Sequence, residues 1–171
     1  MRAPEVFNSN EWFIILVCIF LIIVATVLKR KISYSQIAVI FTLNFFLAAS
    51  LDHILAGPPY DLYDIMDIPD FEVFDFAIYI FIYPLSGYLF VYVFEISDKK
   101  GFPAFFYLLV SSLITLGLEW ISNQFHVFKH NEWTYFHSFA AYFFVYSVNL
   151  GVYFWMKRIN TTCGQNDDVK G

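Results

Sequence analysis

The chain has 171 residues, of which 59% are hydrophobic and 15% charged, and its formal net charge is −5. A soluble domain of this size could not bury so much apolar surface, so the composition excludes that class. No basic patch points to nucleic acid as a partner. The two cysteines, Cys18 and Cys163, have neither the spacing of metal ligands nor the placement expected of a disulfide.

Five long apolar blocks divide the chain, and each is long enough to cross a bilayer as a helix. We expect spans at about residues 12–28, 34–55, 71–94, 103–124 and 133–156, with a disordered cytoplasmic tail at residues 159–171. The predicted fold class is therefore an all-α integral membrane protein with one domain over residues 1–158. The tryptophans lie at the predicted span ends, as interfacial anchors do: Trp12, Trp120, Trp133 and Trp155.

The first block reads as a retained helix. Basic residues follow it at Lys29, Arg30 and Lys31, and no small-residue cleavage site precedes them, so a cleavable signal is not indicated. The block carries almost no polar side chain. We expect it to face lipid, outside a core formed by the other four helices.

The segment after the second block, about residues 56–72, combines helix breakers with five acidic residues. Apolar residues between the charges favour a short helix lying at the membrane surface. In the third block, Pro84 predicts a kink, because a proline inside a helix loses a hydrogen bond and clashes with the preceding turn.

The basic residues predict the orientation. If the five spans alternate, Lys29–Lys31, Lys99–Lys100 and Lys157–Arg158 all fall on one side, which the positive-inside rule makes cytoplasmic. The opposite side keeps only Arg2 and Lys129 among basic residues and takes the acidic loop. We therefore expect a multi-pass protein of the cell membrane with its N-terminus outside.

Four of the five spans carry a polar stripe at the spacing of three or four residues that places side chains on one helix face. The stripes are Asn44, Ala48 and Asp52; Asp75, Tyr79, Tyr83 and Ser86; Ser111, Thr115, Glu119, Ser122 and His126; and Ser138, Tyr142, Tyr146, Asn149 and Tyr153. The simplest packing turns these stripes inward.

The predicted depths gather ionisable groups near the outer ends of the spans. This pattern predicts an outward-facing polar vestibule, roofed by the acidic loop and the histidine-rich loop near residues 125–132. We expect it to bind a ligand, a lipid or a partner protein. Its candidate ligand-binding residues are Asp52, His53, Tyr79, Tyr83, His137 and Tyr142. The expected partners are the bilayer and either a membrane protein or a second copy of the chain.

Two other functions fit the same residues. An intramembrane enzyme acting on a lipid-like substrate would use Glu119 and Asp75 as acid and base, and a proton- or cation-coupled transporter would also depend on Glu119. Ionisable groups within membrane spans are functional candidates by default. A structural carboxylate, hydrogen-bonded to a neighbouring helix, explains Glu119 equally well.

A divalent metal is a further candidate, because imidazole and carboxylate ligands suit zinc, iron or manganese. The ligands would be His126, His130 and Glu119, with the two histidines four residues apart on one face if the segment is helical. No familiar metal-binding motif is present, and no cofactor is favoured.

Several features resemble an uncharacterised family of small polytopic membrane proteins from spore-forming Firmicutes. They are Glu119-Trp120-Ile121 at the end of the fourth span, His130-Asn131-Glu132-Trp133, the Asp52 end of the second span, and Pro84. The resemblance covers about the C-terminal two-thirds of the chain, and Glu132 stands where the family pattern has glycine. It implies a bacterial membrane protein with this fold and carries no established activity.

Overall fold

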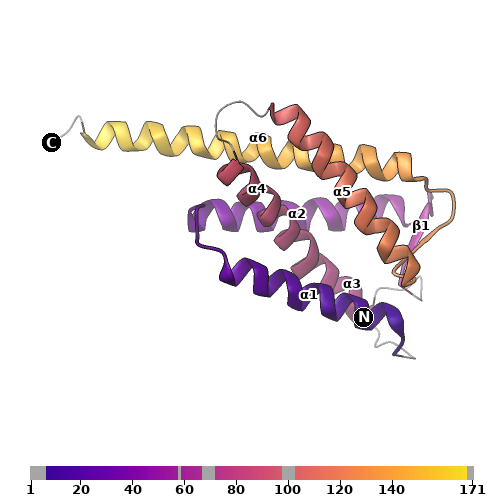
Figure 1. The fold of residues 1–171 in the computed structure, drawn as a ribbon. Coiled ribbons are helices and arrows are strands. Elements are labelled where there is room, and N and C mark those ends of the chain that lie inside the picture. The colour runs from indigo at the N-terminus through magenta and orange to yellow at the C-terminus, as the bar shows by residue number, and fades with distance from the viewer. Residues whose placement is uncertain (1–6, 58, 67–71, 98–102, 169–171) are drawn as a thin grey trace.

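The computed structural model describes residues 7–57, 59–66, 72–97 and 103–168, with side chains as far as residue 159. The protein is mostly helical, at 79%. Within these ranges, five helices are long and apolar enough to cross a membrane, which confirms the predicted blocks (Figure 1). They are Ser9–Val27, Tyr34–Leu55, Val73–Ser97, Ala104–Gln124 and Tyr135–Ile159.

The first two helices begin at side-chain caps that the sequence supplies. Asn8 caps α1 (Ser9–Val27), where its side chain accepts from the backbone N–H of Asn10 and its own N–H donates to Glu11. Ser33 and Gln36 form the same reciprocal pair at the start of α2 (Tyr34–Leu55). Each pair satisfies backbone groups that the first helical turn leaves without partners.

The third span is continuous but not regular. It consists of α3 (Val73–Ala77), a π-helical turn η1 (Ile78–Ile82) and α4 (Tyr83–Ser97). Pro84 lacks an N–H and its ring would collide with the carbonyl of the preceding turn, which the wider π turn avoids. The distortion expected at Pro84 therefore takes the form of a π turn directly before it.

The bundle is built around α2. This helix packs on α4 and on α6 (Tyr135–Asp168), α5 (Ala104–Gln124) packs on α6, and α1 packs along the third span (Figure 1). A reciprocal amide pair joins α2 to α6, with Asn44 Nδ2 2.7 Å from Asn149 Oδ1 and Asn149 Nδ2 3.0 Å from Asn44 Oδ1. Gly87 of α4 lies directly on the Asn44 side chain.

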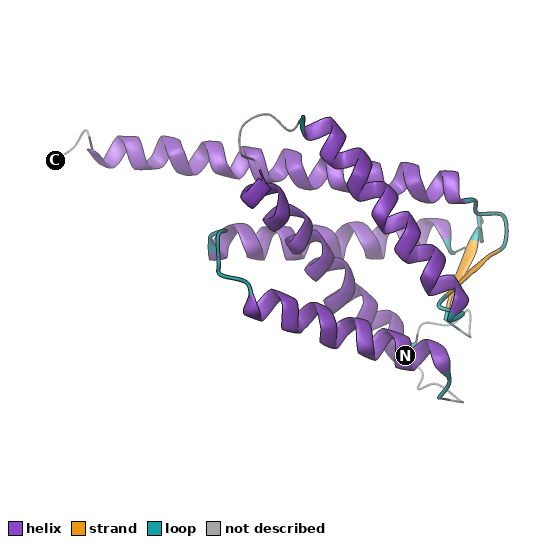
Figure 2. Ribbon diagram, viewed as in Figure 1, coloured by secondary structure: helices purple, strands orange, loops and turns teal. Residues whose placement is uncertain are grey.

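Two short strands close one end of the bundle. Strand β1 (Tyr63–Ile65) pairs antiparallel with β2 (Phe128–His130), in the order that sets Tyr63 opposite His130 (Figure 2). We call this pair the ribbon. The prediction of a short surface helix is wrong at residues 63–65, because these residues find a strand partner in the distant loop after α5. Residues 67–71 lie outside the described part.

The last helix is longer than predicted. The structure continues α6 to Asp168, so residues 159–168 of the predicted disordered tail are helical. No proline interrupts this stretch, and the helix extends beyond the rest of the bundle (Figure 1).

Candidate functional site

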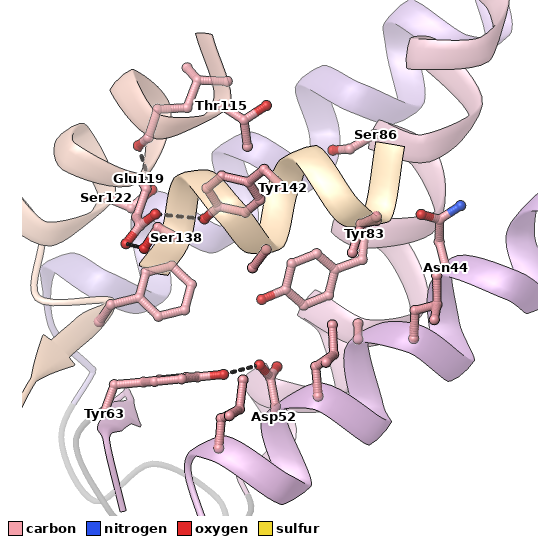
Figure 3. A pocket seen from close by; sticks show the side chains of 18 of the residues that line it. Asn44, Asp52, Tyr63, Tyr83, Ser86, Thr115, Glu119, Ser122, Ser138 and Tyr142 are labelled. Atoms are coloured by element: carbon pink, nitrogen blue, oxygen red, sulfur yellow. Dashed lines mark hydrogen bonds between the residues drawn. The ribbon is translucent and has the colours of Figure 1, made fainter. Parts of the chain in front are cut away.

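A cavity of about 220 Å³ lies between α2, α4, α5 and α6, beside the ribbon (Figure 3). The predicted stripes supply most of its polar wall, since ten of their polar residues line it. These are Asn44, Asp52, Tyr83, Ser86, Thr115, Glu119, Ser122, Ser138, Tyr142 and Tyr146. Helical spacing therefore predicted which faces of four helices meet.

Glu119 forms one wall of the cavity and is hydrogen-bonded on both oxygens. Ser138 Oγ and His130 Nε2 lie 2.8 Å and 3.0 Å from Oε1, and the Tyr142 hydroxyl lies 2.7 Å from Oε2. Trp133 Nε1 donates to Ser138 Oγ at 2.7 Å and so fixes that hydroxyl in turn. Glu119 is only 6% exposed, and its two hydroxyl donors hold the carboxylate in place.

Asp52 forms a second wall, and its two oxygens differ. The Tyr63 hydroxyl donates to Oδ1, and the Tyr79 hydroxyl approaches the same carboxylate. No hydrogen bond from the described residues reaches Oδ2, although Asp52 is only 8% exposed. Burial and the neighbouring carboxylate raise the pKa of the Tyr63 hydroxyl, so it remains a hydrogen-bond donor to Asp52.

The ribbon connects the two carboxylates. Tyr63 and His130 are cross-strand partners, yet Tyr63 reaches Asp52 on α2 whereas His130 reaches Glu119 on α5. The Leu62 carbonyl further accepts three consecutive backbone N–H groups, from residues 131, 132 and 133, at 3.0–3.1 Å. The predicted roof of two loops is therefore a hydrogen-bonded unit.

Tyr83 projects into the space between these walls. In Figure 3 its hydroxyl points into the cavity, and none of the described hydrogen bonds ends on it. The π turn before Pro84 adjoins Tyr83, whose ring stacks on Tyr79 with centroids 6.0 Å apart. The helix distortion thus lies directly beside a residue of the cavity, which is where π turns are often found.

Other predicted site residues lie elsewhere. Asp75, His53 and Tyr79 line a separate and more open hollow of about 440 Å³, whose wall also includes Asp52. Asp75 Oδ2 accepts the N–H of Glu72 at 2.8 Å and so caps its own helix. His137 is exposed near the start of α6, with Nδ1 3.0 Å from Thr134 Oγ1.

The structure brings together only part of the proposed metal set. His130 contacts Glu119, but His126 is exposed and its φ of 59° lies in the left-handed region. The segment is therefore not helical there, and the two histidines do not share a helix face. Among the described residues, no group of three or more histidine, cysteine, aspartate or glutamate side chains is arranged to hold a metal ion.

Many cavity residues were not among the predicted site residues, and three of them are central to the hydrogen bonding of the cavity. Tyr63 lies in a loop with no helical stripe, and no local signal pairs it with a residue 67 positions later. Trp133 was interpreted as an interfacial anchor and instead lines the cavity. Ser138 was placed on a stripe, but its hydrogen bond to Glu119 depends on how α5 and α6 pack.

Comparison with known proteins adds no further constraint. No protein-family model, curated protein sequence or solved structure matches the chain.

Proposed function

We propose that this protein is a multi-pass membrane protein that binds a small, largely apolar molecule in the cavity. The observation that carries the proposal is the cavity itself, which four helices and the ribbon enclose. Its wall is mainly apolar, with a few convergent polar groups that would orient a ligand, as is typical of ligand sites between helices. The apolar part includes Leu47, Leu51, Leu55, Leu118 and Val145.

The proposal includes the orientation, with the N-terminus and the ribbon outside and α1 against lipid. Two contacts support it by gathering basic segments at the end opposite the ribbon. The Tyr92 hydroxyl donates to the Lys29 carbonyl at 3.0 Å, and Lys157 Nζ lies 2.9 Å from Glu95 Oε2. The same end of the bundle thus carries the residues after α1 and those late in α6, which the positive-inside rule makes cytoplasmic.

We favour ligand binding over catalysis by the predicted acid–base pair of Glu119 and Asp75. Glu119 lines the cavity whereas Asp75 lines the neighbouring hollow, so the two carboxylates do not face one common space. Glu119 also accepts hydrogen bonds from Ser138 and Tyr142 and lies 3.0 Å from His130 Nε2, and these contacts hold it in one position. We also propose that the chain belongs with the small membrane proteins of spore-forming Firmicutes that it resembles.

Binding can be measured with cyclohexylmethanol, a compact apolar alcohol. Trp133 lines the cavity and would serve as the fluorescent reporter after Trp12, Trp120 and Trp155 are replaced by Phe. We expect saturable quenching or a spectral shift for the protein in lipid nanodiscs. The change arises because a bound molecule alters the polarity around the indole ring.

Two neighbouring alanines provide the variant and its control. Ala141→Phe fills the cavity and should abolish the fluorescence change, because Ala141 lines it. Ala140→Phe adds the same side chain at an exposed position of α6 and should leave the titration unchanged. Absence of saturable binding to the reporter protein, or equal binding by both variants, would overturn the proposal.

A further inference from the structure

We propose that the cavity selects an organic cation, an ammonium group on an apolar body, and that Asp52 binds the ammonium. This inference rests on the proposed function, because it names the class of molecule that the same cavity accepts. It follows from three independent features: the charge of the wall, the unequal hydrogen bonding of its two carboxylates, and the apolar surface around them.

The formal charge of the cavity wall is negative. Among the described residues that line it, the acids are Asp52 and Glu119 and the single potential cation is His130, with no lysine or arginine. The neutral tyrosine hydroxyls do not offset this charge. Within a low-dielectric bundle such a charge acts strongly on a ligand, so a cation is attracted and a carboxylate or phosphate is repelled.

The two carboxylates are not equally available. Glu119 accepts a hydrogen bond from Ser138 on Oε1 and one from Tyr142 on Oε2, so both of its oxygens are used. Asp52 accepts a hydrogen bond from Tyr63 on Oδ1 and has the Tyr79 hydroxyl beside its carboxylate, while no described donor lies within hydrogen-bond distance of the buried Oδ2. A buried acceptor without a donor is unfavourable, and a ligand that supplies the donor removes that cost.

An ammonium group fits this position better than a single hydroxyl. It carries three N–H donors and a positive charge. Asp52 Oδ2 can accept one of these donors, and the Tyr83 hydroxyl, which points into the same space in Figure 3, can accept another. A charge-assisted hydrogen bond of this kind is about twice as strong as one between neutral groups.

The apolar surface makes the cation an organic one. Much of the remaining wall consists of leucine, alanine and valine side chains of α2, α5 and α6. The wall has only two carboxylates, and no described group of three or more histidine, cysteine, aspartate or glutamate side chains is arranged to replace the hydration shell of a divalent ion. A hydrocarbon body instead gains free energy by leaving water for this surface.

The test compares three probes of one shape: cyclohexylmethylamine, cyclohexylmethanol and cyclohexanecarboxylate. With the Trp133 reporter at pH 7, we expect the amine to bind at least about tenfold more tightly than the alcohol, which corresponds to one charge-assisted hydrogen bond. The carboxylate should bind most weakly. Alcohol binding equal to amine binding would overturn the cation inference and leave the proposed function intact; binding of none of the three would overturn both.

Substitutions at two aspartates distinguish a specific role of Asp52 from a general effect of negative charge. Asp52→Asn keeps the shape of the side chain and should bring the dissociation constants of amine and alcohol to within about twofold of each other. Asp64→Asn removes a carboxylate next to Tyr63 that does not line the cavity, and it should keep the preference for the amine. A preference lost equally in both variants, or kept in Asp52→Asn, would refute Asp52 as the ammonium ligand.

Discussion

Glu119 belongs to the candidate site and also holds neighbouring parts of the fold together. It lines the cavity, yet it also accepts two hydrogen bonds from α6 and contacts His130 of the ribbon, so its contacts join three parts of the fold. A carboxylate held in this way contributes to the shape of the cavity even when it does not touch the ligand. Replacing Glu119 should therefore first lower the free energy of unfolding.

Replacing Glu119 should destabilise the protein in proportion to the hydrogen bonds removed. Glu119→Leu leaves the Ser138 and Tyr142 hydroxyls without their acceptor, at about 1–3 kcal/mol for each, and removes the contact with His130. Glu119→Gln keeps one acceptor oxygen and the volume of the side chain, so its cost should be smaller. Unfolding in detergent with increasing denaturant measures both; equal destabilisation by Leu and Gln would contradict this explanation.

At the scale of the elements, the close approach of α2 and α4 depends on Gly87. A Cβ atom at this position would lie 2.2 Å from Nδ2 of Asn44, far inside contact distance. Asn44 cannot move away freely, because its amide is paired with Asn149 on α6. One glycine thus permits three helices to meet, as small residues commonly do where membrane helices cross.

Gly87→Ala should cost about 1–3 kcal/mol of unfolding free energy, the range typical of overpacking. Gly151→Ala is the matched control, since a Cβ there meets nothing within 4 Å, and alanine favours helix over glycine by about 0.5–1 kcal/mol. The double variant, Asn44→Ala with Gly87→Ala, should lose less unfolding free energy than the two single variants lose together. The shorter side chain at position 44 removes the clash with the new Cβ atom. Additive costs would show that the two residues are not in contact.

For the whole molecule, the arrangement of the spans places the ribbon and the basic segments at opposite ends. Cysteine labelling tests this in a chain with Cys18 and Cys163 replaced. Asn131→Cys, in the exposed loop after the ribbon, should react with a membrane-impermeant maleimide in intact cells. Lys31→Cys, exposed between α1 and α2, should react only after the membrane is disrupted. The reverse pattern would invert the proposed orientation.

The polar lining of the cavity could be predicted because helical periodicity is local. A spacing of three or four residues fixes which side chains share a helix face. Because the rest of each span is apolar and can contact lipid, the polar face is the one that turns inward. Depth in the membrane was a weaker guide. Asp75 and Glu119 were expected at the same depth in the membrane. Depth does not determine toward which side of the bundle a side chain points, and Asp75 lines a different hollow.

The ribbon could not be predicted in the same way. Its strands have three residues each, too few for a visible alternation, and their pairing joins loops on either side of two whole spans. The contacts of Tyr63 follow from that pairing. The spacing of His126 and His130 suggested a shared helix face, which the left-handed backbone at His126 prevents.

The ribbon also imposes an order of assembly. Tyr63 is made well before His130, and α4 and α5 are synthesised between them. Until translation passes residue 133, the Leu62 carbonyl lacks the three amides that it accepts in the finished protein. Chains emerge from the ribosome N-terminal end first, so the first four helices can insert while the cavity still lacks its α6 wall. The cavity is therefore completed only when the last span has been made.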